Sequence, residues 1–456
     1  MTATFAQPDT IRADFSAAMS AMYRTEVPAY GDLLEIVHDT NTTTLDSPAA
    51  EILNLTPDED TTRISQERHG AIRLGTAQEL AMMARVFAVM GMFPVGYYDL
   101  SPAAVPVHST AFRPKTRAAL AANPFRVFTS LLRLELITDE TLRAQAMEIL
   151  AKRQIFTKDA IALTEKAEAN GGLTPADATQ FVAEVLETFR WHADACVDIA
   201  TFDQLNAAHR LIADVVSFKG PHINHLTPRT LDIDAAQAAM ITRGLPAKAI
   251  VEGPPRRNCP ILLRQTSFKA LEEVVNFPAN DGGAAVGSHT ARFGEIEQRG
   301  VALTPKGRAL YDETLASVRA QILPAGDGSN AQAYMDALVK GFDVFPDDWR
   351  RLYDHGLAYF KFVVAQPDAE ATDHSAAALL DAGVLTLSPI IYEDFLPVSA
   401  AGIFQSNLGD DADQDSHSAS SQAAFETALG TAVADEFALY QQIADASLAD
   451  CLNRLN

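Results

Sequence analysis

The chain has 456 residues, of which 48% are hydrophobic, and it carries a formal charge of −23 at neutral pH. This charge repels the phosphates of nucleic acids and of anionic membranes, so neither is expected as a partner. No apolar stretch reaches the length of a membrane span. The opening residues MTATFAQPDTIRADF lack the basic and apolar regions of a secretory signal, which predicts a cytoplasmic protein. The sequence gives no indication of the oligomeric state.

The cysteines indicate no shared structural or metal-binding role. The three cysteines, Cys196, Cys259 and Cys451, are odd in number and widely spaced. They form no CxxC pair, so neither a disulfide framework nor a cysteine-based zinc site is predicted.

The first 138 residues are predicted to contain a helical segment and then a βαβββ unit. Residues 1–62 form the helical segment, with helix predicted over 13–45 from apolar residues at helical spacing. The first unit covers 63–138, with strands predicted at 68–75, 93–100, 105–112 and 127–136 and a helix at 76–91. Thr76 is the predicted N-cap of that helix and Gly91 is its C-terminal stop.

A second βαβββ unit is predicted after a helical insertion at 139–215, which either caps a cleft or supports the structure. The second unit covers 216–302, with strands predicted at 223–230, 248–253, 261–268 and 290–300 and a helix at 232–244. Residues 303–456 are predicted to be a mixed region that completes the site and ends in a helix. The predicted fold class is therefore α+β.

The two units share the same predicted order of strands and helix, which indicates an internal repeat. His69 opens the first unit and His225 opens the second, whereas Glu135 and Glu295 are placed in their last strands. Such repeats bury their apolar faces against one another. A chance match of patterns is the alternative, and a structural role is expected for Glu135.

His69 and Arg73 are the first candidates for chemistry. In the strand RHGAIR, alternation places both side chains on one face with only Ala71 between them. A metal ligand beside an arginine that grips a carboxylate fits this pattern, because the guanidinium binds carboxylates in a bidentate fork. An edge strand with two polar side chains in solvent fits it equally well.

The remaining candidates lie in GPHINHLTPR and SHTARFGEIEQRG. His222 and His225 point to opposite faces of a strand, so only one of them can ligate a metal on a given face. Glu295 and Glu297 share a face and could bind a cation or pair with nearby arginines. His289 is a reserve ligand, and the roles of His222, Glu297 and His289 stay open.

Two histidines and one carboxylate from three strands would form a facial triad. Such a site leaves coordination positions open for a 2-oxo acid and dioxygen, as in non-haem iron(II) oxygenases. The same ligands around zinc would favour a lyase or a hydrolase. Spacing does not separate these alternatives.

Four segments carry a resemblance to known families: ERHGAIRLGT, GPHINHLTPRTLDID, ARFGEIEQRG and YEDFLPVSAAGIFQSNLG. INHLTPRTLDIDAAQ resembles the opening of a vicinal-oxygen-chelate module. FGEIEQRG is similar to the metal-glutamate strand of 4-hydroxyphenylpyruvate dioxygenases, with the ligand at Glu295. Together the four segments, which span 67–409, resemble the 2-oxoadipate dioxygenase/decarboxylase family.

The resemblance implies a vicinal-oxygen-chelate-like core, in which two βαβββ-type units form a curved mixed sheet around a metal cleft. It implies an iron(II) enzyme that converts 2-oxoadipate and dioxygen to (R)-2-hydroxyglutarate and carbon dioxide in lysine catabolism. Zinc, manganese or nickel can take the place of iron in a purified sample.

The resemblance also implies the residue roles. His69, His225 and Glu295 would bind the metal, and His69 and His225 would also face the substrate. Arg73 would hold the distal carboxylate of the substrate, and Val398 and Ser399 would meet the same carboxylate. The alternatives are a zinc- or manganese-dependent lyase or isomerase of the glyoxalase type, which needs no oxygen, and a binding protein with a vestigial triad.

Overall fold

The computed structural model describes residues 4–48, 61–268, 270–279, 283–368, 375–396 and 418–455. Its first helices are α1 (Pro8–Glu26) and α2 (Ala29–Leu45), so the helix predicted over 13–45 is two helices. Pro28 explains the break, because a proline disfavours helical geometry in the residue before it. Val27, the residue concerned, closes α1 with a non-helical backbone.

The segment predicted as the first βαβββ unit contains four strands and two helices, with the second, short helix between its last two strands. It follows α4 (Thr61–Gln66) and consists of β1 (Arg68–Leu74), α5 (Ala77–Val89), β2 (Phe93–Asp99), β3 (Val107–Arg113), α6 (Arg117–Ala122) and β4 (Arg126–Leu132). Its strands lie in the order β2-β3-β4-β1, with β4 parallel to β1 and the other pairs antiparallel. Thr76 caps α5 in a capping box with Glu79, and Gly91 adopts a positive φ just after the helix.

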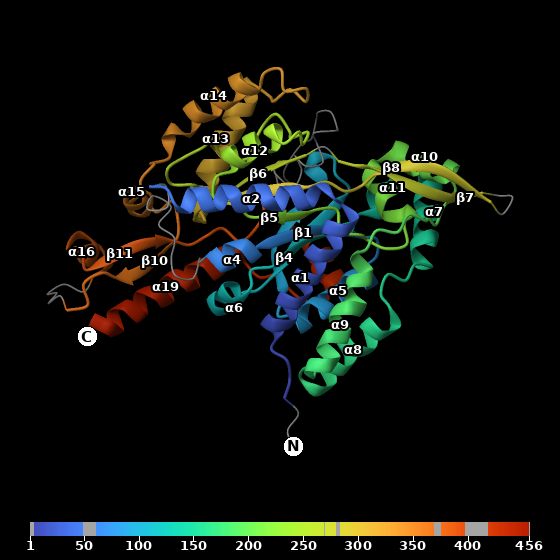
Figure 1. The fold of residues 1–456 in the computed structure, drawn as a ribbon, viewed down its shortest axis with the longest axis horizontal. Helices are drawn as coiled ribbons and strands as arrows, with labels where there is room; N and C mark the ends of the chain where they lie inside the picture. The colour runs from blue at the N-terminus through green and yellow to red at the C-terminus, as the bar shows by residue number, and fades with distance from the viewer. Residues whose placement is uncertain are drawn as a thin grey trace.

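The predicted helical insertion is also present. It contains α7 (Glu140–Ala151), α8 (Lys158–Asn170), α9 (Pro175–Leu186), α10 (Ile199–Ala208) and α11 (Arg210–Ser217). Helix α9 packs on α1, and α8 packs on α5 and α9. In Figure 1, α8 and α9 extend below the sheet, whereas α7, α10 and α11 gather at its right-hand side. The insertion therefore contacts the sheet region from two sides.

The second unit differs from its prediction. It contains β5 (Leu226–Pro228), α12 (Ile233–Thr242), β6 (Leu263–Ser267), β7 (Glu272–Pro278), β8 (Ala284–Thr290) and β9 (Glu295–Arg299). Strand β5 joins β1 as the fifth strand of the first sheet, whereas β6 pairs with β9 and β7 with β8. The hairpin of β7 and β8 was not predicted, and it projects to the right in Figure 1.

Three strand predictions are wrong in their extent. Residues 248–253 contribute only the isolated bridge between Glu252 and Gln265, because Gly253 has φ near +105° and is followed by two prolines. The strand predicted at 290–300 is divided, since β8 ends at Thr290 and β9 begins at Glu295. Glu135 lies beyond the end of β4 in a short 3-10 turn, where it pairs with Arg133 at the surface.

The C-terminal region is mixed, as predicted. It contains α13 (Pro305–Gln321), α14 (Ala331–Gly341), α15 (Trp349–Asp354), β10 (Phe360–Val364), α16 (Ala376–Asp381), β11 (Leu385–Pro389), α18 (Ser418–Leu429) and α19 (Glu436–Leu455). Strands β10 and β11 form an antiparallel pair that packs on α19. The predicted terminal helix is two helices, because Gly430 takes a positive φ after α18. Val398 and Ser399 lie outside the described residues.

One face of β1 packs against the apolar core, and the other face carries candidate site residues. Ile72 and Leu74 point into the apolar cluster formed with α1, α5 and α9. By strand alternation, His69 and Arg73 point to the opposite face. Among the described residues, no helix combines the length and the apolar character needed to cross a bilayer.

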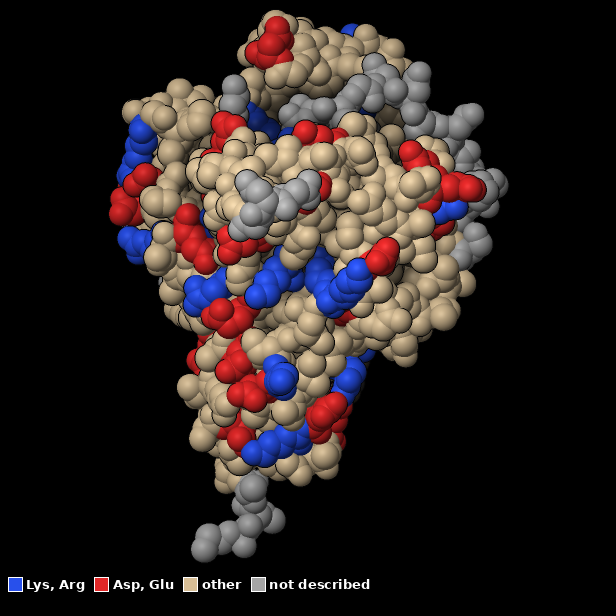
Figure 2. All heavy atoms as spheres, turned by 90° about the vertical axis from the view of Figure 1, so that its right-hand side faces the viewer, with Lys and Arg blue, Asp and Glu red and all other residues tan. Residues whose placement is uncertain are grey.

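Surface charges are mingled on the face that Figure 2 shows. A band of basic side chains crosses the middle of this face, with acidic side chains above and below it. Basic and acidic side chains therefore lie beside one another on this face, although the chain as a whole is strongly acidic.

Candidate metal centre

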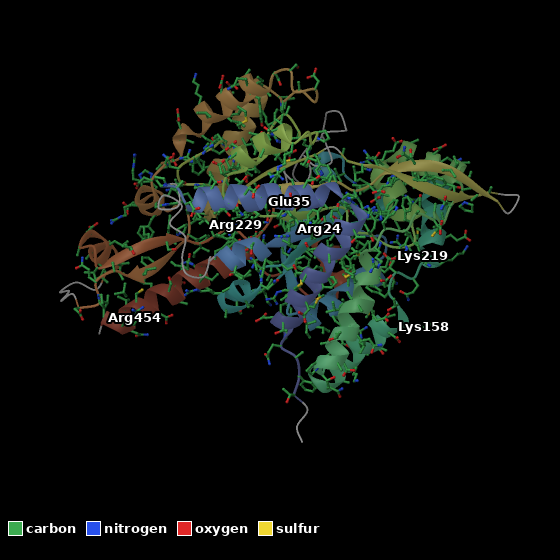
Figure 3. All side chains as sticks on the ribbon, viewed as in Figure 1. Arg24, Glu35, Lys158, Lys219, Arg229 and Arg454 are labelled. Carbon is green, nitrogen blue, oxygen red and sulfur yellow. The ribbon has the colours of Figure 1, made fainter. Side chains whose placement is uncertain are left out.

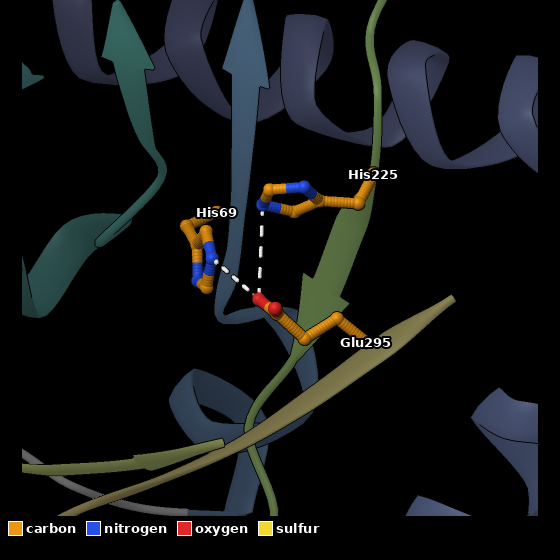
Figure 4. Close-up of side chains that lie close together, drawn as sticks. All are labelled: His69, His225 and Glu295. Carbon is orange, nitrogen blue, oxygen red and sulfur yellow. Dashed lines mark ion pairs between the residues drawn. The ribbon is translucent and has the colours of Figure 1, made fainter. Parts of the chain in front are cut away.

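Three predicted ligands come together. His69 lies in β1, His225 immediately precedes β5, and Glu295 opens β9 (Figure 4). One donor atom from each lies within 4.8 Å of the others, and all three residues are buried. Segments up to 226 positions apart are joined here because β5 pairs with β1 and Arg229, just after β5, bridges to Glu297 of β9.

The carboxylate oxygen Oε1 of Glu295 is the centre of this arrangement. It lies 3.2 Å from Nε2 of His69 and 3.7 Å from Nε2 of His225. Thr227 and Gln265 each donate a hydrogen bond to the same oxygen, both at 3.0 Å. Two side chains that the sequence analysis did not single out therefore orient the carboxylate.

Aromatic rings hold the two imidazoles in place. The ring of Phe395 meets that of His69 edge-on with centroids 5.0 Å apart, and Phe293 lies 4.9 Å from His225. Both histidines are almost fully buried. Their ring planes have little freedom to turn away from Glu295, so the donor geometry is set before any ligand arrives.

The donor set fits a divalent transition metal. Burial lowers the pKa of His225 to about 4, so its imidazole is neutral at pH 7 and has a lone pair for a metal. Burial raises the pKa of Glu295, but His225 and His69 outweigh it and hold this pKa below its ordinary value. A neutral imidazole and an ionised carboxylate are the forms that bind metals.

His69 has a carboxylate on each side. Its Nδ1 lies 3.0 Å from Oε2 of Glu297, on the side away from Glu295. Burial lowers the pKa of His69, but Glu297 and Glu295 outweigh it and raise this pKa. A carboxylate on one ring nitrogen orients the other nitrogen toward a metal. The open question of Glu297 is thus resolved geometrically: it touches His69 and not Glu295.

Glu297 belongs to a larger group of buried charges, here named the arginine-rich cluster. Its members are Arg63, Arg126, Arg229 and Arg299 with Glu67, Glu297 and Glu393. Arg126 contacts all three carboxylates. Figure 3 places Arg229 near the middle of the molecule, whereas Arg454 lies at the end of α19. The cluster connects His69 to Glu393, which lies five positions before Val398.

A second group of buried polar residues, here named the Asp214 cluster, surrounds Arg73. Nη1 of Arg73 contacts Oδ2 of Asp214 at 2.6 Å. Oδ1 of Asp214 lies 2.8 Å from Nε2 of His289 and 3.4 Å from Nε2 of His222. His222 and His289 therefore serve Asp214 and are not part of the three-residue donor set. Only His225 of the pair in GPHINH faces Glu295, as their spacing predicted.

The sequence analysis missed several side chains of this region. Thr227 is two positions after His225 in the strand, which is a signal that it shares the same face. Gln265 lies in the predicted strand 261–268, but no spacing relates it to Glu295. Asp214 lies in a buried helix among apolar residues. A lone aspartate there signals an ion pair, because buried charges need partners.

Comparison with known proteins identifies the family of the chain. A profile of the family described as 2-oxoadipate dioxygenase/decarboxylase matches residues 15–407. Two proteins named 2-oxoadipate dioxygenase/decarboxylase are similar along nearly their whole length: one from Pseudomonas putida is 57% identical, covering 99% of this chain and 98% of its own, and one from Escherichia coli is 54% identical, covering 97% and 98%.

A solved structure is similar in fold and sequence. The crystal structure of the hydroxyglutarate synthase from Pseudomonas putida in complex with 2-oxoadipate superposes with a TM-score of 0.91 at 54% identity, and the match covers 99% of both chains. The family profile, the relatives and this structure agree over almost the entire sequence. The chain therefore belongs to the 2-oxoadipate dioxygenase/decarboxylase family.

Proposed function

We propose that this chain is an iron(II)-dependent dioxygenase that converts 2-oxoadipate and dioxygen to (R)-2-hydroxyglutarate and carbon dioxide, as a step of lysine catabolism. One observation carries the proposal: in a member of this family, the donor atoms of the buried residues His69, His225 and Glu295 lie within 4.8 Å of one another. The solved relative that contains 2-oxoadipate supports the choice of substrate.

His69, His225 and Glu295 would hold the metal, and iron(II) supplies the chemistry that activates dioxygen. The reaction balances with one dioxygen per 2-oxoadipate. The C1 carboxylate leaves as carbon dioxide, C2 becomes the new carboxylate with one oxygen atom, and C3 gains a hydroxyl with the other. The protein must therefore bring C3 to a fixed place.

Arg73 is the proposed anchor for the distal carboxylate. Strand alternation places it on the same face of β1 as His69. Burial is the main cause of the lowered pKa of His225, and the charge of Arg73 contributes to it, which is consistent with a position near the donor set. Val398 and Ser399 are proposed to meet the same carboxylate. Holding one end of the diacid at Arg73 and the other at the metal fixes the position of C3.

Other residues orient the ligands and exclude water. Thr227 and Gln265 hold Oε1 of Glu295, and Glu297 holds Nδ1 of His69. Phe293 and Phe395 cover the two imidazoles. A buried, pre-oriented donor set needs little rearrangement when the substrate binds.

We also propose a vicinal-oxygen-chelate-like core for the chain. The first unit, 63–138, has the order β1-α5-β2-β3-α6-β4, and the second, 216–302, repeats a strand-helix-strand start before β9. The segments 1–62, 139–215 and 303–456 are then additions around this core. The loss of regular strand at 248–253 is the main departure of the second unit from the first.

Oxygen uptake by iron(II)-reconstituted protein tests the proposed function. With 2-oxoadipate added, uptake should match the formation of 2-hydroxyglutarate one to one. Turnover of a 2-oxo acid at full rate without oxygen would instead identify a lyase or isomerase of the glyoxalase type. A metal-independent affinity with no turnover would identify a binding protein.

Replacement of Arg73 tests the anchor separately. Removing one side of a desolvated charge pair costs roughly 3–5 kcal/mol. Arg73→Ala should therefore raise KM for 2-oxoadipate by about a hundredfold or more, while metal binding stays intact. An unchanged KM would refute the anchor and leave the reaction type untouched.

A further inference from the structure

Arg73 is held by a carboxylate that comes from a distant part of the chain. Asp214 lies in α11 of the helical insertion, 141 positions after Arg73, and its Oδ2 contacts Nη1 of Arg73 at 2.6 Å. The side chain of Asp214 is only 6% exposed. Burying a charged carboxylate costs free energy unless it is paired, so the ion pair with Arg73 stabilises Asp214 in this position.

The geometry of Asp214 is fixed from its other side. Its Oδ1 is occupied by His289 of β8 at 2.8 Å and lies 3.4 Å from His222. Asp214 contacts Nη1 of Arg73 through its other oxygen, Oδ2. A guanidinium carries five N–H donors and can serve more than one acceptor at once, so a contact with Asp214 and a contact with a substrate carboxylate can coexist.

Aromatic rings keep the two histidines in place. Phe218 stacks on His289 with ring centroids 5.1 Å apart, and Trp191 meets His222 edge-on at 4.8 Å. Asp214 stays ionised in this setting: burial raises its pKa, but Arg73 and His222 outweigh burial and hold the pKa well below its ordinary value. The aspartate is thus a fixed negative charge against which Arg73 is oriented.

Orientation matters because arginine is long. Its side chain has many rotamers, and ordering such a chain when a ligand binds costs conformational entropy. An arginine that is already held by Asp214 avoids this cost. The benefit goes only to a substrate that uses Arg73, which is one with a second carboxylate at its far end.

We propose that Asp214 is a positioning residue that orients Arg73, and that His289 and His222 hold Asp214, so that the site selects 2-oxo acids with a distal carboxylate. The inference rests on the proposed role of Arg73 and extends it to specificity. It assigns the helical insertion 139–215 a part in the substrate site, in addition to its packing.

Binding of two six-carbon acids tests the inference. 2-Oxoadipate and 2-oxohexanoate share the 2-oxo acid group and the chain length, but only the first has a distal carboxylate. Dissociation constants are measured by calorimetry with iron(II)-loaded protein under anaerobic conditions. Asp214→Asn should weaken the binding of 2-oxoadipate at least tenfold and leave that of 2-oxohexanoate within twofold.

A merely structural role for Asp214 predicts a different result, in which both acids lose affinity equally. That result, or no change for either acid, overturns the inference. Asp99→Asn is a matched control, because Asp99 also pairs with an arginine, Arg133, at 3.2 Å in a partly buried setting. The control should change neither dissociation constant.

Two further variants separate the possible failures. If Arg73→Ala leaves the binding of 2-oxoadipate unchanged, the proposed anchor is wrong and this inference falls with it. If Arg73→Ala weakens binding and Asp214→Asn does not, this inference alone is wrong. Should Asp214→Asn fail to fold, His289→Asn decides: a threefold to tenfold loss confined to 2-oxoadipate supports the inference, and unchanged selectivity overturns it.

Discussion

The arginine-rich cluster and the Asp214 cluster lie at opposite ends of β1 and differ in how their charges are satisfied. Glu67 directly precedes the strand and meets Arg126 and Arg229, whereas Arg73 near the end of the strand meets Asp214. In the first cluster, several arginines and carboxylates bind one another in a closed network. In the second cluster, the carboxylate of Asp214 contacts Arg73 and lies beside two histidines. The closed network suits a structural role, whereas the Asp214 cluster holds Arg73, the proposed anchor for the substrate.

The largest effect on stability is expected at the centre of the closed network. Arg126 is fully buried and contacts Glu67, Glu297 and Glu393, so Arg126→Met leaves three carboxylates short of a partner. Such a loss costs at least roughly 3–5 kcal/mol. Urea titration of the metal-free protein should show this decrease in the free energy of unfolding.

The pair of Arg85 and Glu168 provides the control for Arg126. Its contact is also short, 2.7 Å, but both side chains are more than 40% exposed. Arg85→Met should cost less than about 1 kcal/mol. If the two variants lose equal stability, the closed network is not structural and the contrast between the clusters disappears.

Acid should weaken the closed network through Glu297. Burial raises the pKa of Glu297, but Arg299 and His69 outweigh it and lower the pKa from 4.5 to about 2. A lowered carboxylate pKa contributes stability that is complete above about pH 4.5 and is lost as the pH falls toward 2. The shift corresponds to a contribution on the order of 3 kcal/mol.

The measurement compares metal-free wild type with Glu297→Gln at pH 7, 5, 4 and 3. The advantage of the wild type in free energy of unfolding should be constant down to about pH 5 and should shrink markedly by pH 3. An advantage that is independent of pH would mean that the charge of Glu297 contributes nothing.

The smallest of these effects concerns metal affinity. Glu297 touches Nδ1 of His69, and loss of such an outer contact weakens metal binding by roughly 10–100-fold. Glu297→Gln should therefore bind nickel(II) about tenfold more weakly in a competition assay against a chelator. Glu393→Gln is the matched control, because Glu393 contacts Arg63 and Arg126 but not Asp214 or the donor set in any described interaction. Equal losses in both variants would assign the effect to the network as a whole.

The first unit could be predicted from sequence because its signals are local. Thr76 and Gly91 mark the ends of α5, and RHGAIRL forms strand β1 as its pattern predicted. The second unit was predicted less well because its strands are short and depend on distant partners. Strand β5 has only three residues, and it exists through pairing with β1.

The donor set was predicted through resemblance, and the residues around it were not. His69, His225 and Glu295 stand in recognisable motifs, and the structure brings one donor atom from each within 4.8 Å of the others. Asp214, Thr227 and Gln265 act through contacts over 30 to 141 positions, and no periodicity records such contacts. Their roles depend on the packing of four segments, which only the folded chain provides.

Strand β1 sets a coarse scale for substrate length. A side chain can move along the strand and keep its face only in steps of two residues, which is roughly 6.6 Å. Neighbouring diacids differ by a single carbon–carbon bond, a far smaller step. Relocation of the arginine along β1 would therefore overshoot any neighbouring substrate. Fine adjustment between diacids of similar length must come from the reach and tilt of the Arg73 side chain, and thus from the partners that hold its guanidinium.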